Sequence, residues 1–322
     1  MSAAAAASAS LLAAGAARAT TCAGTGVYQL TNANSIACVN VGPNNQDGMF
    51  YWSVDGLNQL AKQWFWYRVG DSGPEHSIDT IGTPAIQTFD LDGDSQADKL
   101  QALYSGTGFT IQIAYTLLGQ PLNTYGSHIT ENIVIKNTDA NSALAMHFYQ
   151  YSDFNLGYPG DHPGVPGDND TVEFQFNNTI FQYDRANLYP FNPANQPPNI
   201  NLAETFDNPA PSFCEINTVG PNGTLAELND SDPTTLSGCS TPVSGDVTWA
   251  FEWDKLLQSA GSHQGPVATD TLSITKQKQL YVSIPSGDGY FSESAPEPAT
   301  IALFGVGVLG LAAIRRRRSA AS

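Results

Sequence analysis

The sequence predicts an all-β protein, an antiparallel β-sandwich, on three observations. Apolar and polar residues alternate with a period of two along many short segments. Turn residues such as Asp-Gly, Gly-Asp and Pro-Gly separate these segments at short intervals. No long stretch shows the 3.6-residue period of an amphipathic helix. Two packed sheets with a total of about a dozen strands would bury one face of each sheet.

The clearest alternation lies in residues 108–119, where Phe109, Ile111, Ile113, Tyr115 and Leu117 share one face. We expect the same pattern to form strands at residues 170–178, 247–254 and 279–285, and further strands at 49–54, 63–69, 98–105, 128–137, 143–154 and 179–184. These segments predict the two sheets of the sandwich.

Two regions interrupt the strand pattern. Residues 156–170 are rich in glycine and proline, and residues 188–213 are rich in proline and asparagine. We expect both to be loops, and the second to be a surface excursion. The alternative is that residues 188–213 mark a boundary between two subdomains, because long structureless loops are uncommon inside one domain.

The chain has four cysteines, Cys22, Cys38, Cys214 and Cys239. An even number in an exported chain favours disulfides, although four cysteines allow three connectivities. We favour the local pairs Cys22–Cys38 and Cys214–Cys239. Neither spacing matches a C-x-x-C zinc or redox motif.

The first 19 residues resemble a secretory signal, with an Ala/Leu-rich run and an A-x-A site at Ala17-Arg18-Ala19. They lack a basic n-region, and the alternative is an alanine-rich tail. The exported body would then span residues 20–294.

The composition is strongly acidic, with a formal net charge of −17 and only 13% charged residues. Without Arg18 and Arg315 to Arg318, the net charge becomes about −22. Such a body would be repelled by nucleic acid, so we expect no nucleic-acid partner. Divalent cations are natural partners for it.

Residues 295–318 combine three features. Pro296-Glu297-Pro298 is followed by the charge-free run 299–314 and then by Arg315, Arg316, Arg317 and Arg318. As a helix, sixteen residues would extend about 24 Å, slightly short of the hydrocarbon core of a bilayer. We expect a single transmembrane helix, with the arginines cytoplasmic and the body outside.

This three-part arrangement resembles the PEP-CTERM sorting signal. The resemblance implies that an exosortase in the membrane handles the protein near Pro-Glu-Pro, in bacteria that also make exopolysaccharide. The mature body would then reach the cell surface or the extracellular biofilm matrix. The body also resembles uncharacterised PEP-CTERM surface proteins, in HITENIVIKNT, FYQYSDFNLG and VTWAFEWDKLL…LSITKQKQL.

The segment FDLDGDSQADKL predicts a calcium site. Asp90, Asp92, Asp94 and Asp98 occupy positions 1, 3, 5 and 9 of a calcium-loop spacing, and Gln96 at position 7 would add its carbonyl oxygen. The loop departs from an EF-hand, because Gly93 stands at position 4 and position 12 is not glutamate. The alternative is an acidic turn that binds no ion.

A second polar cluster is weaker. Its members are Asp153, Asp161, His162, Asp168, Asp170 and Glu173, together with His147. It offers ligands for a transition metal or a carboxylate pair for glycoside hydrolysis, but we favour a solvated loop. The tryptophans suggest either a bulky core, which we favour, or a platform that stacks on sugars.

These observations predict a non-catalytic, calcium-stabilised protein of the cell surface or exopolysaccharide matrix, acting in matrix structure or adhesion. Its expected partners are the exosortase, an exopolysaccharide, and the membrane through the C-terminal helix before processing. One alternative is a polysaccharide hydrolase that uses carboxylates between Asp153 and Glu173. Another is a structural surface-layer protein.

Overall fold

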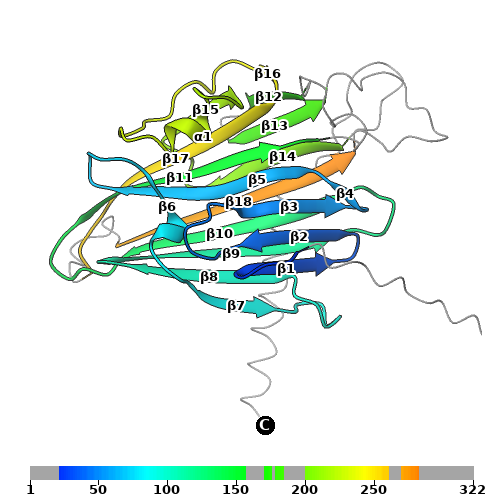
Figure 1. The fold of residues 1–322 in the computed structure, drawn as a ribbon, viewed down its shortest axis with the longest axis horizontal. Coiled ribbons are helices and arrows are strands. Elements are labelled where there is room, and N and C mark those ends of the chain that lie inside the picture. The colour runs from blue at the N-terminus through cyan, green and yellow to red at the C-terminus, as the bar shows by residue number, and fades with distance from the viewer. Residues whose placement is uncertain (1–21, 157–169, 176–177, 185–199, 261–269, 283–322) are drawn as a thin grey trace, which may run out of the picture.

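The computed structural model describes residues 22–156, 170–175, 178–184, 200–260 and 270–282, and within them the chain forms two β-sheets (Figure 1). The predicted signal segment and the C-terminal helix with its flanking Pro296-Glu297-Pro298 and arginines lie outside these residues. Among the residues that are described, no helix has the length and apolar character needed to cross a bilayer.

The first sheet contains nine of the described strands. Its main path runs β1 (Val27–Asn32), β2 (Ser35–Asn40), β3 (Gly48–Val54), β5 (Leu60–Val69), β11 (Leu144–Phe154), β17 (Val247–Leu257) and β15 (Phe213–Thr218), with β4 (Leu57–Asn58) beside β3 and β6 (His76–Ser77) beside β5. Neighbouring strands are antiparallel, except for a short parallel pairing of β3 with β5.

The second sheet also contains nine of the described strands, all antiparallel. They lie in the order β16 (Val243–Gly245), β12 (Asp170–Gln175), β13 (Thr179–Asp184), β14 (Ile200–Asn208), β18 (Thr271–Val282), β10 (Ser127–Asn137), β9 (Phe109–Gly119), β8 (Lys99–Gly106) and β7 (Ala85–Phe89). In Figure 1 the strands of the two sheets run in similar directions and overlap across the view. The predicted all-β architecture is confirmed.

The two sheets pack face to face around one hydrophobic core. The five apolar side chains predicted to share a face of residues 108–119 are all buried in it. Phe206 of the second sheet packs edge-on against Phe251 of the first, with 4.1 Å between ring centroids. Full burial of such a side chain contributes about 1.5–3 kcal/mol, so the interleaved apolar faces hold the sheets together.

Part of the outer face of the first sheet, over β5, β11 and β17, is covered as well. Two segments lie there: residues 70–81, which include the 3₁₀ turn η1 (Ile78–Thr80), and residues 219–242, which include α1 (Thr224–Glu227). We call the second of these the covering segment. Trp64 and Trp66 point outward from β5, yet Trp64 donates to Ser77 Oγ at 2.8 Å and Trp66 to Asn229 Oδ1 at 3.3 Å.

All five tryptophans are therefore buried, with no more than 2% of any exposed. The interpretation of the tryptophans as a bulky core is confirmed, and they do not form an exposed platform for sugars.

Both favoured disulfides are present, Cys22–Cys38 and Cys214–Cys239. The first joins the start of the described chain to β2. The second joins β15 to the covering segment and so holds that segment to the edge of the first sheet. Closing a loop of this kind stabilises a fold by about 2–4 kcal/mol.

The prediction of a structureless stretch at 188–213 is wrong for its described part. β14 lies inside that stretch and pairs with β13 and β18 in the middle of the second sheet. Ile200, Leu202 and Phe206 face the core, but Glu204 stands between them and breaks the apolar alternation. That interruption hides the strand in the sequence.

Four charged side chains lie together in the core, and we call them the inner quartet: Glu131 on β10, Glu204 on β14, and Lys276 and Lys278 on β18. Lys276 Nζ lies 2.7 Å from Glu131 and 2.8 Å from Glu204, while Lys278 Nζ lies 2.5 Å from Glu131 and 3.1 Å from Glu204. Burial alone would raise the pKa of Glu204, but the two lysines outweigh burial and lower this pKa to about 2.

The inner quartet also connects the two sheets. Lys276 donates to Gln150 Oε1 on β11, and Trp249 on β17 donates to Glu204 Oε2 at 2.8 Å. Since buried charges need both counter-charges and hydrogen bonds, these cross-sheet contacts complete the environment of the quartet.

Candidate metal-binding sites

The acidic loop predicted to bind calcium connects β7 to β8. Gly93 and Ser95 adopt positive φ angles of 87° and 72°, which bend the loop back over Asp90. Asp90 accepts hydrogen bonds from the backbone N–H groups of Gly93 at 2.6 Å and Ser95 at 2.9 Å. These N–H groups lower the pKa of Asp90, so the loop favours a charged carboxylate at this position.

Three of the five predicted ligands come together in this loop. Carboxylate oxygens of Asp90, Asp92 and Asp98 all lie within 4.8 Å of one another. Burial raises the pKa of Asp98. The Leu91 N–H opposes this rise, and the negative charges of Asp92 and Asp90 add to it. Three crowded carboxylates offer the oxygen ligands that calcium prefers.

The other two predicted ligands bond to each other. Asp94 Oδ1 accepts a hydrogen bond from the Gln96 backbone N–H at 2.8 Å, and Asp94 Oδ2 accepts one from Gln96 Nε2 at 3.3 Å. The loop is also tied to the first sheet, because Asn32 on β1 donates to Asp92 Oδ2 at 3.0 Å.

The second predicted cluster does not assemble around His147 in the described residues. Asp161, His162 and Asp168 lie outside them. Asp153 is on β11 in the first sheet, whereas Asp170 and Glu173 are on β12 in the second sheet. His147 lies six residues from Asp153 along β11, a distance of about 20 Å in an extended strand.

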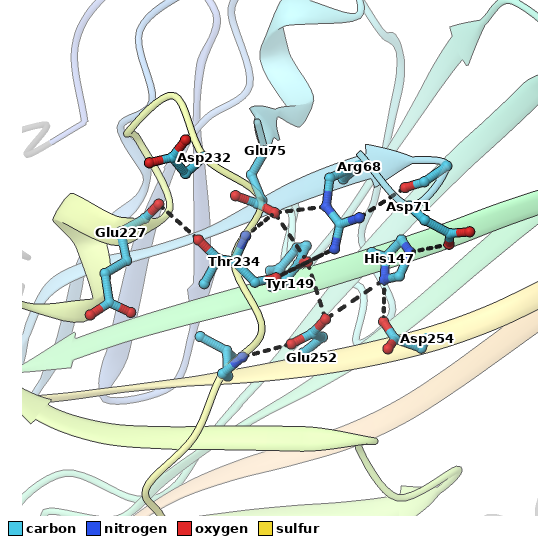
Figure 2. A network of polar contacts seen from close by, with 12 residues as sticks. Arg68, Asp71, Glu75, His147, Tyr149, Glu227, Asp232, Thr234, Glu252 and Asp254 are labelled. Atoms are coloured by element: carbon cyan, nitrogen blue, oxygen red, sulfur yellow. Dashed lines mark hydrogen bonds and ion pairs between the residues drawn. The ribbon is translucent and has the colours of Figure 1, made fainter. Parts of the chain in front are cut away.

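His147 instead belongs to a network on the outer face of the first sheet (Figure 2). Strand register places it between Arg68 on β5 and Asp254 on β17, and the next outward position of β11, Tyr149, lies opposite Glu252. Phe251, next to Glu252 on β17, contacts Phe206 of the second sheet, and Gln150, next to Tyr149 on β11, accepts from Lys276 of the second sheet. This network and the inner quartet therefore lie on opposite sides of the first sheet. We call it the outer network; its charged members are Arg68, Asp71, Glu75, His147, Glu252 and Asp254.

In one half of the outer network, a buried arginine is paired with a buried glutamate. Arg68 Nε lies 2.9 Å from Glu75 Oε1, and both side chains are almost fully buried. Arg68 also donates to the hydroxyl of Tyr149 at 3.1 Å, and the Thr234 N–H donates to Glu75 at 3.0 Å. These bonds fasten the covering segment onto β5 and β11.

The other half holds three carboxylates around one histidine. His147 Nδ1 lies 2.5 Å from Asp254 Oδ1 and 3.7 Å from Glu252 Oε1, and Nε2 lies 3.6 Å from Asp71 Oδ1. The relevant atoms of His147, Glu252 and Asp254 all lie within 4.8 Å of one another. Figure 2 shows the imidazole between Asp71 on one side and Glu252 and Asp254 on the other.

Glu252 is the most constrained member of this half. Its side chain is fully buried, and it accepts hydrogen bonds from the Leu236 N–H at 2.8 Å and the Tyr149 hydroxyl at 3.1 Å. Burial raises the pKa of Glu252 to about 8; the Leu236 N–H opposes this rise, and the neighbouring Asp254 adds to it. Glu252 therefore lacks the counter-charge that Glu204 has.

Glu252 and Asp254 were not among the predicted site residues. They come from a strand more than a hundred residues after His147, so only the β11–β17 register reveals their proximity. One local signal was present in the sequence. The spacing Glu-Trp-Asp in VTWAFEWD places two carboxylates on one face of a strand whose other face is aromatic.

Comparison with known proteins identifies one segment of the chain. Residues 294–318 match the PEP-CTERM protein-sorting motif, which includes the Pro-Glu-Pro triplet, the apolar run and the arginine cluster. The match covers the end of the chain and not the β-rich body, and no curated protein matches the sequence. The chain thus carries a PEP-CTERM sorting motif, which implies export, anchoring in the membrane and processing by an exosortase before the protein reaches the cell surface.

Proposed function

We propose that the β-rich body is a non-catalytic component of the cell surface or exopolysaccharide matrix, where it contributes to matrix structure or adhesion and is stabilised by calcium. The sorting motif at residues 294–318 carries this proposal, because it directs the body to the outside of the cell. Two disulfides and a low content of charged residues suit that environment.

The acidic loop supports a calcium-stabilised body. Asp90, Asp92 and Asp98 form a crowded group whose mutual repulsion a dication would relieve. The loop also contacts the edge of the first sheet, through Asp92 with Asn32 and through the Thr31 N–H, which donates to the Ala97 carbonyl at 2.8 Å. An ion in the loop would therefore strengthen contact between the two sheets.

The net charge supports a role for calcium in matrix contacts as well. A body with a charge of about −22 repels anionic polysaccharides, and bound calcium reduces that repulsion. Because the tryptophans are buried, contact with a polysaccharide would depend on polar surface groups and bridging ions.

The test is co-sedimentation of the purified protein with exopolysaccharide from the source strain, in calcium and then in EDTA. We expect retention in calcium, release in EDTA, and reduced retention of the double variant Asp90→Asn/Asp92→Asn. The matched control is Asp230→Asn/Asp232→Asn, which removes the same charge from an exposed turn of the covering segment.

Absence of retention under both conditions would overturn the proposed contact with the exopolysaccharide matrix. Calcium-dependent self-association without polysaccharide would then indicate a surface-layer protein. Equal retention in calcium and in EDTA would show that calcium binding by the acidic loop is not needed for contact with the polysaccharide.

A further inference from the structure

We propose that His147, Glu252 and Asp254 bind a divalent transition-metal ion such as Zn²⁺, at a site separate from the acidic loop. This inference goes beyond the proposed matrix function and does not depend on it. It is based on the geometry of three adjacent strands, β5, β11 and β17, and on the side chains that surround the imidazole.

The ligand atoms are arranged for coordination. Zinc binds nitrogen and oxygen ligands at about 2.0–2.2 Å, which separates two ligands of a tetrahedral site by about 3.3–3.6 Å. The separation of 3.7 Å between His147 Nδ1 and Glu252 Oε1 is close to that value. Asp254 is hydrogen-bonded to Nδ1 at 2.5 Å and would retreat by about 1 Å, which its partly exposed side chain allows.

The groups around the ligands also fit a metal site. A metal-binding histidine usually donates its second ring N–H to a carboxylate, which fixes the orientation of the ring. Asp71 Oδ1 lies 3.6 Å from Nε2, on the side of the ring away from Glu252 and Asp254, and its exposed side chain would have to approach by about 0.5 Å to accept this hydrogen bond. Glu252 is held in turn by the Tyr149 hydroxyl and the Leu236 N–H.

The local charge favours a cation. Three carboxylates surround His147, and their ion pairs within the described residues involve only that histidine. The nearby Arg68 is engaged by Glu75. A dication would therefore supply the positive charge that this half of the outer network lacks.

The ligand set distinguishes the metal. One imidazole nitrogen with two carboxylates suits zinc and similar divalent ions, whereas calcium takes oxygen ligands almost exclusively. Three protein ligands leave a coordination position for water or for a ligand from another molecule. Asp71 is 94% exposed and Asp254 is 32% exposed, so the site opens toward solvent on their side.

The test is isothermal titration of untagged, EDTA-treated protein with ZnCl₂, followed by titration with Co²⁺, whose absorption spectrum reports the coordination geometry. We expect one zinc ion per chain at this site. We also expect His147→Gln and Asp254→Asn each to weaken binding at least about 10-fold. His76→Gln, at an exposed histidine on β6, is the matched control and should leave zinc affinity unchanged.

A second arm separates the two sites. The acidic-loop variant Asp90→Asn/Asp92→Asn should retain zinc binding. Tryptophan fluorescence should confirm that each variant is folded, since the five indoles report on the core. The proposal would be overturned if the wild-type protein does not bind zinc. It would also be overturned if the folded His147→Gln and Asp254→Asn variants bind zinc with the same affinity as the wild-type protein.

Discussion

Glu204 and Glu252 are both fully buried glutamates on β-strands, yet their pKa values lie on opposite sides of the usual range. Glu204 faces the core and contacts Lys276 and Lys278, and its pKa falls to about 2. Glu252 faces outward beside Asp254, and its pKa rises to about 8. Burial disfavours the charged form at both positions, so the neighbouring counter-charges decide which form each glutamate keeps.

The same difference separates the two networks to which these glutamates belong. The inner quartet sets two lysines against two glutamates, and each lysine contacts both. In the outer network, one arginine and one histidine face four carboxylates. The positive and negative charges of the inner quartet balance, whereas a proton or a metal ion would stabilise the outer network by reducing its excess of negative charge.

The largest expected effect comes from breaking the inner quartet. Lys276→Met should lower the free energy of unfolding by about 3–5 kcal/mol, because Glu131 and Glu204 would then share Lys278 alone in the core. Urea unfolding followed by tryptophan fluorescence measures this loss. The control is Lys136→Met, which removes an exposed ion pair with Asp270 at 3.9 Å and should cost no more than about 1 kcal/mol. Equal losses in the two variants would contradict a special role for the quartet.

The next effect is a difference in the sign of pH dependence, measured in metal-free protein. The usual glutamate pKa is about 4 and that of folded Glu204 is about 2. Between these two pH values the unfolded chain binds a proton that folded Glu204 does not. The free energy of unfolding therefore falls as the pH is lowered from about 4 to about 2. From about pH 4 to pH 8, folded Glu252 keeps a proton that the unfolded chain has released, so stability falls as the pH is raised.

The slope that Glu252 contributes should not exceed about 1.4 kcal/mol per pH unit. Glu252→Gln should remove this contribution and make stability between pH 6 and 8 less dependent on pH. Denaturant unfolding at a series of pH values measures both slopes. An unchanged slope in Glu252→Gln would show that this carboxyl is ionised in the folded protein.

The smallest expected effect tests how the two halves of the outer network are joined. Tyr149→Phe removes the hydroxyl that accepts from Arg68 and lies within hydrogen-bonding distance of Glu252 and the Thr234 carbonyl. We expect a loss of about 1 kcal/mol in unfolding experiments. Tyr28→Phe, on edge strand β1, is the control and should change stability by less than about 0.5 kcal/mol. A loss no greater than that of the control would mean that the hydroxyl does not couple the two halves.

The predictable parts of this protein are those whose signal lies within one segment. Residues 108–119 alternate cleanly and form β9, and the acidic loop brings together Asp90, Asp92 and Asp98 from nine consecutive positions. β14 was hidden because Glu204 occupies a core position, and its compensating lysines lie more than seventy residues away.

The outer network is a stronger example of contacts that local sequence patterns do not predict. His147 was a candidate ligand in the sequence, but its neighbours were assigned to the following loop because that loop is close in sequence. Its actual neighbours, Glu252 and Asp254, are set by the register of β11 with β17. Chain register over such separations is decided by the packing of whole sheets and cannot be seen from local spacing.

The position of β18 has a mechanical consequence. The sorting motif begins at residue 294, twelve residues beyond Val282, where β18 ends. β18 lies in the interior of the second sheet, with β10 on one side and β14 on the other. While the motif holds the chain at the membrane, any drag on the body is transmitted through this strand and loads the hydrogen bonds of both neighbours in shear. The lysines of β18 form ion pairs with a glutamate on each neighbouring strand. A tethered body would therefore resist the force as one unit, whereas a strand at a sheet edge would separate one hydrogen bond at a time.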